Sequence, residues 1–188
     1  EPGAILSAVA DSVIHRTSLP LVVVRRAKGL TTTLPGLFAK ALVPVSGTRS
    51  SRAAQEVAFN LAAALGTEIT LLHVVSRADD QEPEPVGARL PAGAEGVVHT
   101  SDRVLEQASG LAAELGATSR QLTRRGVSVA DEIINAAAAQ DVDLVVLGAD
   151  PRQLDDRAFL GHTVEEVLAR CAATVVVVTV PPESGTTG

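Results

Sequence analysis

The sequence Asp143-Leu144-Val145-Val146-Leu147-Gly148 is followed by a polar loop, by a helix pattern that opens at Gly161-His162-Thr163, and by the run Thr174-Val175-Val176-Val177-Val178-Thr179-Val180. Two β-branched runs that enclose one helix are typical of a βαβ unit in a parallel sheet. Ligands of open α/β sheets bind beyond the carboxyl ends of the strands, where a helix start presents free amides and a positive dipole end. This stretch therefore predicts a site for an anion such as a phosphate.

Upstream of this unit, apolar strands alternate with amphipathic helices. Ser50 and Ser51 are candidate N-caps of the first helix, and Gly66 and Gly116 stand where two helices should end. The strand expected at 118–123 is half polar, which favours an edge position. Five strands alternating with helices predict crossover connections, and so an α/β fold: a three-layer sandwich around a doubly wound parallel five-stranded sheet. The predicted strands are 40–45, 69–75, 118–123, 144–147 and 174–180, and the helices begin near residues 50, 100, 128 and 161.

Composition excludes several classes of function. The chain of 188 residues has a formal charge of -6 and no basic cluster, which argues against nucleic acid as a partner. No apolar run approaches the ~20 residues needed to span a bilayer, so direct membrane insertion of this chain is not expected. Cys171 is the single cysteine, which fits a reducing compartment and predicts a cytoplasmic location. No group of histidines, cysteines and carboxylates has the spacing of a metal site.

The beginning of the chain resembles its end. Residues 6–16 align with 160–170, and Leu21 to Val24 align with Val175 to Val178. We interpret residues 1–25 as the last helix and strand of a preceding, similar domain. The alternative is that a helix followed by a valine-rich strand is a common sequence pattern and that the similarity has no further meaning. The expected organisation is then a linker at 26–39, a main domain at 40–182 with a mobile loop at 77–98, and a disordered tail at 183–188. We expect Leu21–Val24 to pair antiparallel with Val175–Val180 and to cover that strand edge.

Taken together, these patterns resemble the universal stress protein domain family. The resemblance is carried by Ala41-Leu42-Val43-Pro44-Val45-Ser46-Gly47-Thr48, Leu71-Leu72-His73-Val74-Val75, residues 143–148, and Leu160-Gly161 with the valine strand that follows. It implies a Rossmann-like fold of the adenine nucleotide alpha hydrolase type, with strand order 3-2-1-4-5. It also implies pairing of two domains, in a symmetry mate or a neighbouring family domain, through their last strands. Such domains are found fused to membrane transporters such as cation/proton antiporters, so a parent transporter is left open as a partner.

The same resemblance implies an adenine nucleotide, such as ATP, at the carboxyl ends of the first and fourth strands. Nucleotide-binding members carry a glycine, two residues, a second glycine, nine residues, then glycine and a hydroxyl residue. Here Gly148 and Gly161 hold the first and third positions, while Pro151 and His162 replace the others. Mg²⁺ is expected only beside a triphosphate. The candidate binding residues are Pro44, Val45, Ser46, Val74, Leu147, Gly148, Ala149, Arg152, Gly161, His162, Thr163 and Val164.

The departures from the motif weaken the expected site. Pro151 has no N–H to donate, and its φ is fixed. Ser46 stands where the family's first strand usually ends in Asp, and a hydroxyl makes fewer hydrogen bonds than a carboxylate. Arg152 and Thr163 still offer phosphate ligands. As alternatives, Ser46 and Thr48 simply build a turn and cap the next helix, and His162 is a solvent-facing residue of a first helical turn.

The sequence contains no catalytic constellation and no Walker-type Gly-Lys-Ser or Gly-Lys-Thr, so no enzyme activity is expected. Two hypotheses follow. In the first, the chain is a regulatory stress-response module that binds an adenine nucleotide weakly at the Gly148/Gly161 loop. In the second, it is a structural dimerisation domain whose pocket no longer binds nucleotide.

Overall fold

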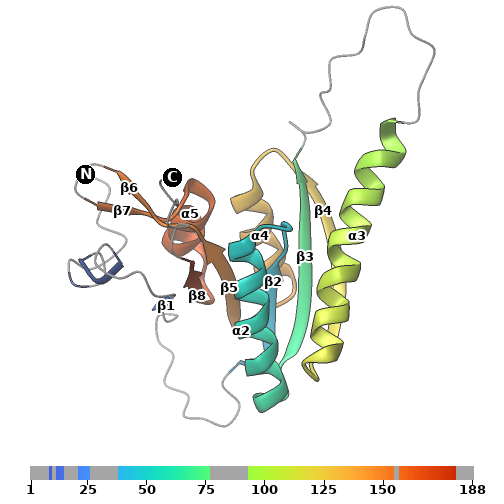
Figure 1. Cartoon of the computed structure of the whole chain (residues 1–188), viewed down its shortest axis with the longest axis horizontal. Coiled ribbons are helices and arrows are strands. Elements are labelled where there is room, and N and C mark those ends of the chain that lie inside the picture. The colour runs from blue at the N-terminus through green and yellow to red at the C-terminus, as the bar shows by residue number, and fades with distance from the viewer. Residues whose placement is uncertain are drawn as a thin grey trace, which may run out of the picture.

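A six-stranded sheet organises the computed structural model, which describes residues 9, 12–14, 21–25, 38–76, 93–154 and 157–180 (Figure 1). The strand order is β1-β8-β5-β2-β3-β4, and every neighbouring pair is parallel except β1 with β8. The strands are β1 (Leu21–Arg25), β2 (Lys40–Pro44), β3 (Glu68–Ser76), β4 (Ser119–Gly126), β5 (Leu144–Ala149) and β8 (Thr174–Thr179).

Helices cover the sheet on both faces and give three layers. One face packs against α2 (Arg49–Leu65) and α3 (Gly93–Glu114), and the other packs against α4 (Val129–Ala139) and α5 (His162–Arg170). The chain therefore has the expected α/β sandwich.

None of the helices in the part of the chain that the structure describes is long and apolar enough to cross a membrane.

Strands β5 and β8 consist almost entirely of apolar residues because both of their faces are buried. Val146 of β5 packs into the core under α2 and α3, whereas its neighbours Val145 and Leu147 pack into the core under α4 and α5. In β8, Val176 and Val177 divide between the two cores in the same way. A strand at the centre of such a sheet therefore shows no polar alternation in its sequence.

The strand order agrees with the order that the family resemblance implies. Taken in chain order, the five parallel strands β2, β3, β4, β5 and β8 lie as 3-2-1-4-5, and β1 adds a sixth strand outside them. The half-polar β4 lies at the other edge of the sheet, as its composition predicts. The proposed domain boundaries stay a prediction.

Three local expectations are corrected by the structure. The N-cap of α2 is Thr48, not Ser50 or Ser51, because the Thr48 hydroxyl accepts a hydrogen bond from the Ser51 amide at 3.2 Å. Helix α3 begins at Gly93, within the loop expected at 77–98. Glycine is a poor helix former, so Gly93 and Gly96 lower the helix propensity of this stretch, although the apolar spacing of the helix continues back to Val97. The polar loop after β5 contains an antiparallel hairpin of β6 (Arg152–Leu154) and β7 (Arg157–Phe159).

Other expectations fall outside the described residues. These are residues 77–92 of the expected mobile loop, residues 26–37 of the expected linker, the tail at 183–188, and most of the helix expected before residue 17.

Strand β1 lies along the outer edge of β8, in antiparallel register from Leu21 opposite Thr179 to Arg25 opposite Val175. Leu21 and Val23 pack against the core under α4 and α5, whereas Val22 and Val24 are about half exposed. The Arg25 guanidinium donates through Nη2 to the carbonyl oxygens of Cys171 and Ala173, at 2.6 and 2.7 Å. These bonds attach β1 to the end of α5.

Removing residues 1–25 should raise self-association, because it exposes the valine edge of β8 for pairing with another chain. Arg25→Ala should act in the same direction but more weakly, since it removes only the two bonds to the carbonyls after α5. Arg103→Ala, on the exposed face of α3, is the matched control. Sedimentation equilibrium measures the association constants, and a truncated chain that stays monomeric would contradict the role assigned to β1.

Candidate functional site

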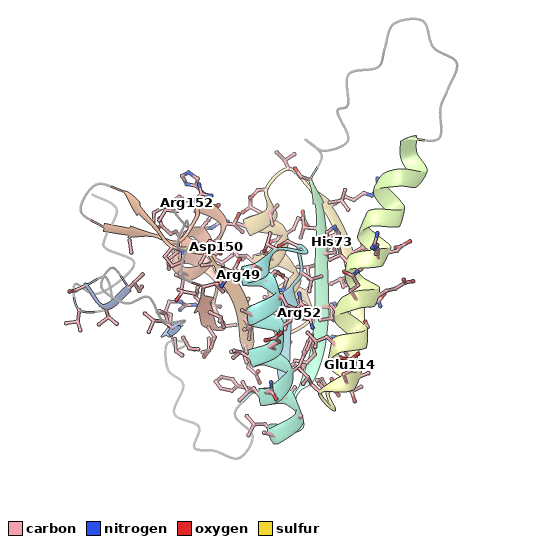
Figure 2. All side chains as sticks on the ribbon, viewed as in Figure 1. Arg49, Arg52, His73, Glu114, Asp150 and Arg152 are labelled. Atoms are coloured by element: carbon pink, nitrogen blue, oxygen red, sulfur yellow. The ribbon has the colours of Figure 1, made fainter. Side chains whose placement is uncertain are left out.

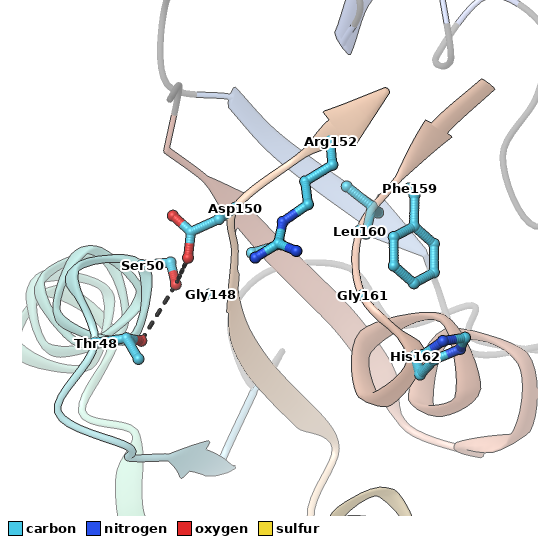
Figure 3. Close-up of a pocket in the computed structure, with 10 residues that line it drawn as sticks. Thr48, Ser50, Gly148, Asp150, Arg152, Phe159, Leu160, Gly161 and His162 are labelled. Atoms are coloured by element: carbon cyan, nitrogen blue, oxygen red, sulfur yellow. Dashed lines mark hydrogen bonds between the residues drawn. The ribbon is translucent and has the colours of Figure 1, made fainter. Parts of the chain in front are cut away.

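A pocket of about 320 Å³ opens where β5 ends and where α2 and α5 begin (Figure 3). It falls within the usual volume range of small-molecule sites. Asp150 and Arg152, which belong to it, lie toward one end of the molecule, and Glu114 at the end of α3 lies toward the other (Figure 2). The residues that line the pocket are Thr48, Ser50, Gly148, Ala149, Asp150, Arg152, Phe159, Leu160, Gly161 and His162.

The topology explains why the pocket lies here. The helix after β2 crosses one face of the sheet, and the helix after β5 lies on the opposite face. In open α/β sheets, a crevice forms at the carboxyl ends of two adjacent strands when the chain continues from one strand to a helix on one face and from the other strand to a helix on the opposite face. The register of β2 with β5 spans only Ala41–Leu144 and Leu42–Val145, so the two strands are not paired beyond that point. The pocket occupies this switch point of the fold.

Gly148 allows the first turn of α2 to approach the end of β5. A Cβ at position 148 would lie 2.1 Å from the carbonyl oxygen of Ser50 and 2.6 Å from the amide nitrogen of Ser51. No side chain fits at such distances, so the residue here has to be glycine. The glycine that the motif identifies therefore has a packing role at the rim of the pocket.

A chain of hydroxyl groups joins the two sides of the pocket. Ser46 Oγ lies 3.2 Å from Thr48 Oγ1, which in turn lies 3.3 Å from Ser50 Oγ. The buried Ser50 hydroxyl donates to Asp150 Oδ2 at 2.7 Å. A carboxylate from the loop after β5 is thus held at the start of α2, where the positive end of the helix dipole stabilises it.

The other side of the pocket is the start of α5. Gly161 is its N-cap at φ 98°, in the left-handed region that favours glycine, and among the described residues no side-chain hydrogen bond caps the helix. Glu165, in the first turn of α5, accepts a hydrogen bond at 3.3 Å from the backbone N–H of Leu160, which is a lining residue. The His162 ring packs edge-on against Phe159, with 4.9 Å between ring centroids.

The far end of α5 is fixed by an ion pair. The Arg170 guanidinium lies 2.7 Å from a carboxylate oxygen of Asp131 and also contacts Glu166. The hydrogen bond from Arg170, followed by one from Ser128, lowers the pKa of the Asp131 carboxyl below its usual value. Asp131 belongs to the first turn of α4, so the pair joins the two helices on this face.

The structure brings part of the predicted residue set together. Gly148, Ala149, Arg152, Gly161 and His162 line the pocket. Val45, Leu147 and Val164 are buried in the core, and Ser46 lies at the end of the hydroxyl chain. The remaining predicted residues lie outside the lining: Pro44, Val74 and Thr163. The Val45 carbonyl accepts a hydrogen bond from His73 Nδ1 at 2.8 Å, which agrees with a structural role for that histidine.

Sequence reasoning missed half of the lining, namely Thr48, Ser50, Asp150, Phe159 and Leu160. The signal for Asp150 was its place two residues after Gly148. Ser50 and Asp150 stand 100 positions apart, and no local pattern relates them. Within the described residues, no group of three or more histidine, cysteine, aspartate and glutamate side chains could hold a metal ion.

The parallel sheet with its pocket at the switch point defines a doubly wound α/β protein of the nucleotide-binding type of architecture. The universal stress protein family matches residues 38–179, and the chain belongs to this family.

Solved structures share the fold, whereas no curated protein sequence matches the chain. Universal stress protein UspA from Lactobacillus plantarum aligns at TM-score 0.56 and 22% identity, over 77% of this chain and 99% of its own. The universal stress protein from Archaeoglobus fulgidus in complex with dAMP aligns at TM-score 0.54 and 13% identity, over 76% and 98%. A universal stress protein in complex with cAMP aligns at TM-score 0.55 and 19% identity, over 77% and 98%.

Gly148→Ala should destabilise the fold by about 2 kcal/mol or more, because the new methyl group meets the backbone of Ser50 and Ser51. Gly110→Ala, inside α3 with no atom within 4 Å of the new Cβ, is the control, and it should leave stability unchanged or raise it. Thermal unfolding followed by circular dichroism measures both variants. Equal unfolding temperatures for the two variants would contradict the close approach of β5 to α2.

Proposed function

We propose that the chain is a regulatory stress-response module that binds an adenine nucleotide weakly in the pocket between α2 and α5. The observation that carries the proposal is the pocket itself, which lies at the switch point of the sheet beside the Gly161 helix start and the Arg152 side chain. Helix starts bind phosphate through free amides and the helix dipole. The ligands dAMP and cAMP in two structures of the same fold support an adenine nucleotide as the class of ligand.

Arg152 is the cation placed to meet the phosphate. Its exposed side chain lines the pocket, and in the close-up its guanidinium lies between Asp150 and Gly161 (Figure 3). A guanidinium can donate two hydrogen bonds to one phosphate group. The amides at the start of α5 and Arg152 together would therefore hold the phosphate.

Weak binding is expected because the loop departs from the family motif. Pro151 removes one backbone donor, and Ser46 is already hydrogen-bonded within the turn before α2. A bound triphosphate would bring Mg²⁺ with it, because Mg²⁺ is usually held by the phosphate oxygens of the substrate and keeps several water ligands.

Isothermal titration calorimetry with AMP, ATP and cyclic AMP tests the proposal. We expect saturable binding that Arg152→Ala weakens about tenfold or more, because a hydrogen bond to a charged group typically contributes ~1.5–3 kcal/mol. Arg103→Ala should bind like the parent chain. An absence of heat at millimolar concentrations of all three ligands would reject the proposal.

The second candidate function is a structural pairing domain that binds no nucleotide, such as the cytosolic regulatory domain of a membrane transporter of the cation/proton antiporter class. Two observations favour it: Pro151 in the phosphate loop, and a carboxylate, Asp150, in the pocket. Such a domain would act through the edge of its last strand, to which β1 is already paired.

The triple variant Ser46→Asp, Pro151→Gly and His162→Ser separates the two candidates, because it restores the family motif. If the pocket of the parent chain has lost binding, the triple variant should bind ATP while the parent does not. Comparable ATP affinity in both proteins, measured by calorimetry, would contradict the second candidate.

A further inference from the structure

Two helix starts face one pocket, and they are not equivalent. Thr48 and Ser50 bring the start of α2 into the lining, and Gly161 and His162 bring the start of α5. Each start attracts negative charge through its amides and dipole. The charges around each start therefore decide where an anionic ligand can lie.

The start of α2 already has an anion from the chain itself. Asp150 Oδ2 accepts the hydrogen bond of Ser50 at 2.7 Å, and Ser50 is only 5% exposed. The position of the carboxylate is fixed by the backbone, because Gly148, two residues earlier, is in close contact with Ser50. An incoming phosphate cannot take this place without displacing Asp150 or lying beside a like charge.

Among the described residues that line the pocket, none at the start of α5 is acidic. Gly161 has no side chain, and the Glu165 carboxylate in the first turn of α5 accepts a hydrogen bond from the Leu160 amide and is not itself part of the lining. Arg152 is the cation of the lining, and it comes from the strand whose partner leads into α5. One phosphate group at this start meets a guanidinium and free amides, whereas each further phosphate adds negative charge to a pocket that already contains the Asp150 carboxylate.

We propose that Asp150 makes the pocket select adenine nucleotides with one phosphate group over those with three. The inference rests on the proposed function, since it concerns the same site. The carboxylate repels the second and third phosphates, each of which adds negative charge to the same pocket. Asp150 acts by this repulsion and is not required for binding of the first phosphate.

Asp150→Asn tests the inference, because the amide oxygen can still accept the Ser50 hydrogen bond while the charge is removed. Calorimetry with AMP and with ATP, in EDTA, gives the ratio of the two dissociation constants. We expect the parent chain to bind AMP more tightly. Asp150→Asn should tighten ATP binding about tenfold and change AMP binding less than about threefold. Asp102→Asn on the exposed face of α3 is the control and should leave the ratio unchanged.

The outcomes separate the inference from the function on which it rests. If the parent chain binds both nucleotides and Asp150→Asn leaves their ratio unchanged, the selectivity is overturned while nucleotide binding stands. If the parent binds neither nucleotide and Asp150→Asn binds neither, both are overturned. The titrations are repeated with Mg²⁺. Tight binding of magnesium ATP by the parent that Asp150→Asn abolishes would make Asp150 a cation ligand and would also overturn the inference.

Discussion

The close contact between Gly148 and the first turn of α2 is the constraint on which the site depends. Strand β5 must carry no side chain at this position, since the backbone of Ser50 and Ser51 fills the space that a Cβ would need. The contact places the loop after β5 against the start of α2 and fixes Asp150 beside a buried hydroxyl. The hairpin of β6 and β7 then returns the chain to the start of α5, which completes the pocket.

Much of the fold could be predicted from local patterns, because the burial of a strand determines which of its positions are apolar. Strands β5 and β8 are covered on both faces, so their unbroken runs of valine and leucine identified them. Half-polar β4 was recognised as an edge strand for the opposite reason. The strand order itself came from the family resemblance, since the spacing of strands along a chain does not determine their order in a sheet.

The pocket could be predicted only in part. Its glycines and Arg152 stand in one short stretch, whereas the link from Ser50 to Asp150 exists only after β2 and β5 have come together. The N-cap of α2 could not be chosen from sequence, because Thr48, Ser50 and Ser51 all carry a hydroxyl group that fits a cap. The hairpin was missed because strands of three residues are too short for an alternating pattern.

Helix α5 joins two parts of the molecule that are far apart in sequence. Its first residue belongs to the pocket, and the carbonyl groups at and after its last turn are held by Arg25 of β1. The helix between these two attachments has nine residues and is therefore about 14 Å long. The lip of the pocket and the edge strand are therefore joined through one short hydrogen-bonded element that is anchored at both of its ends.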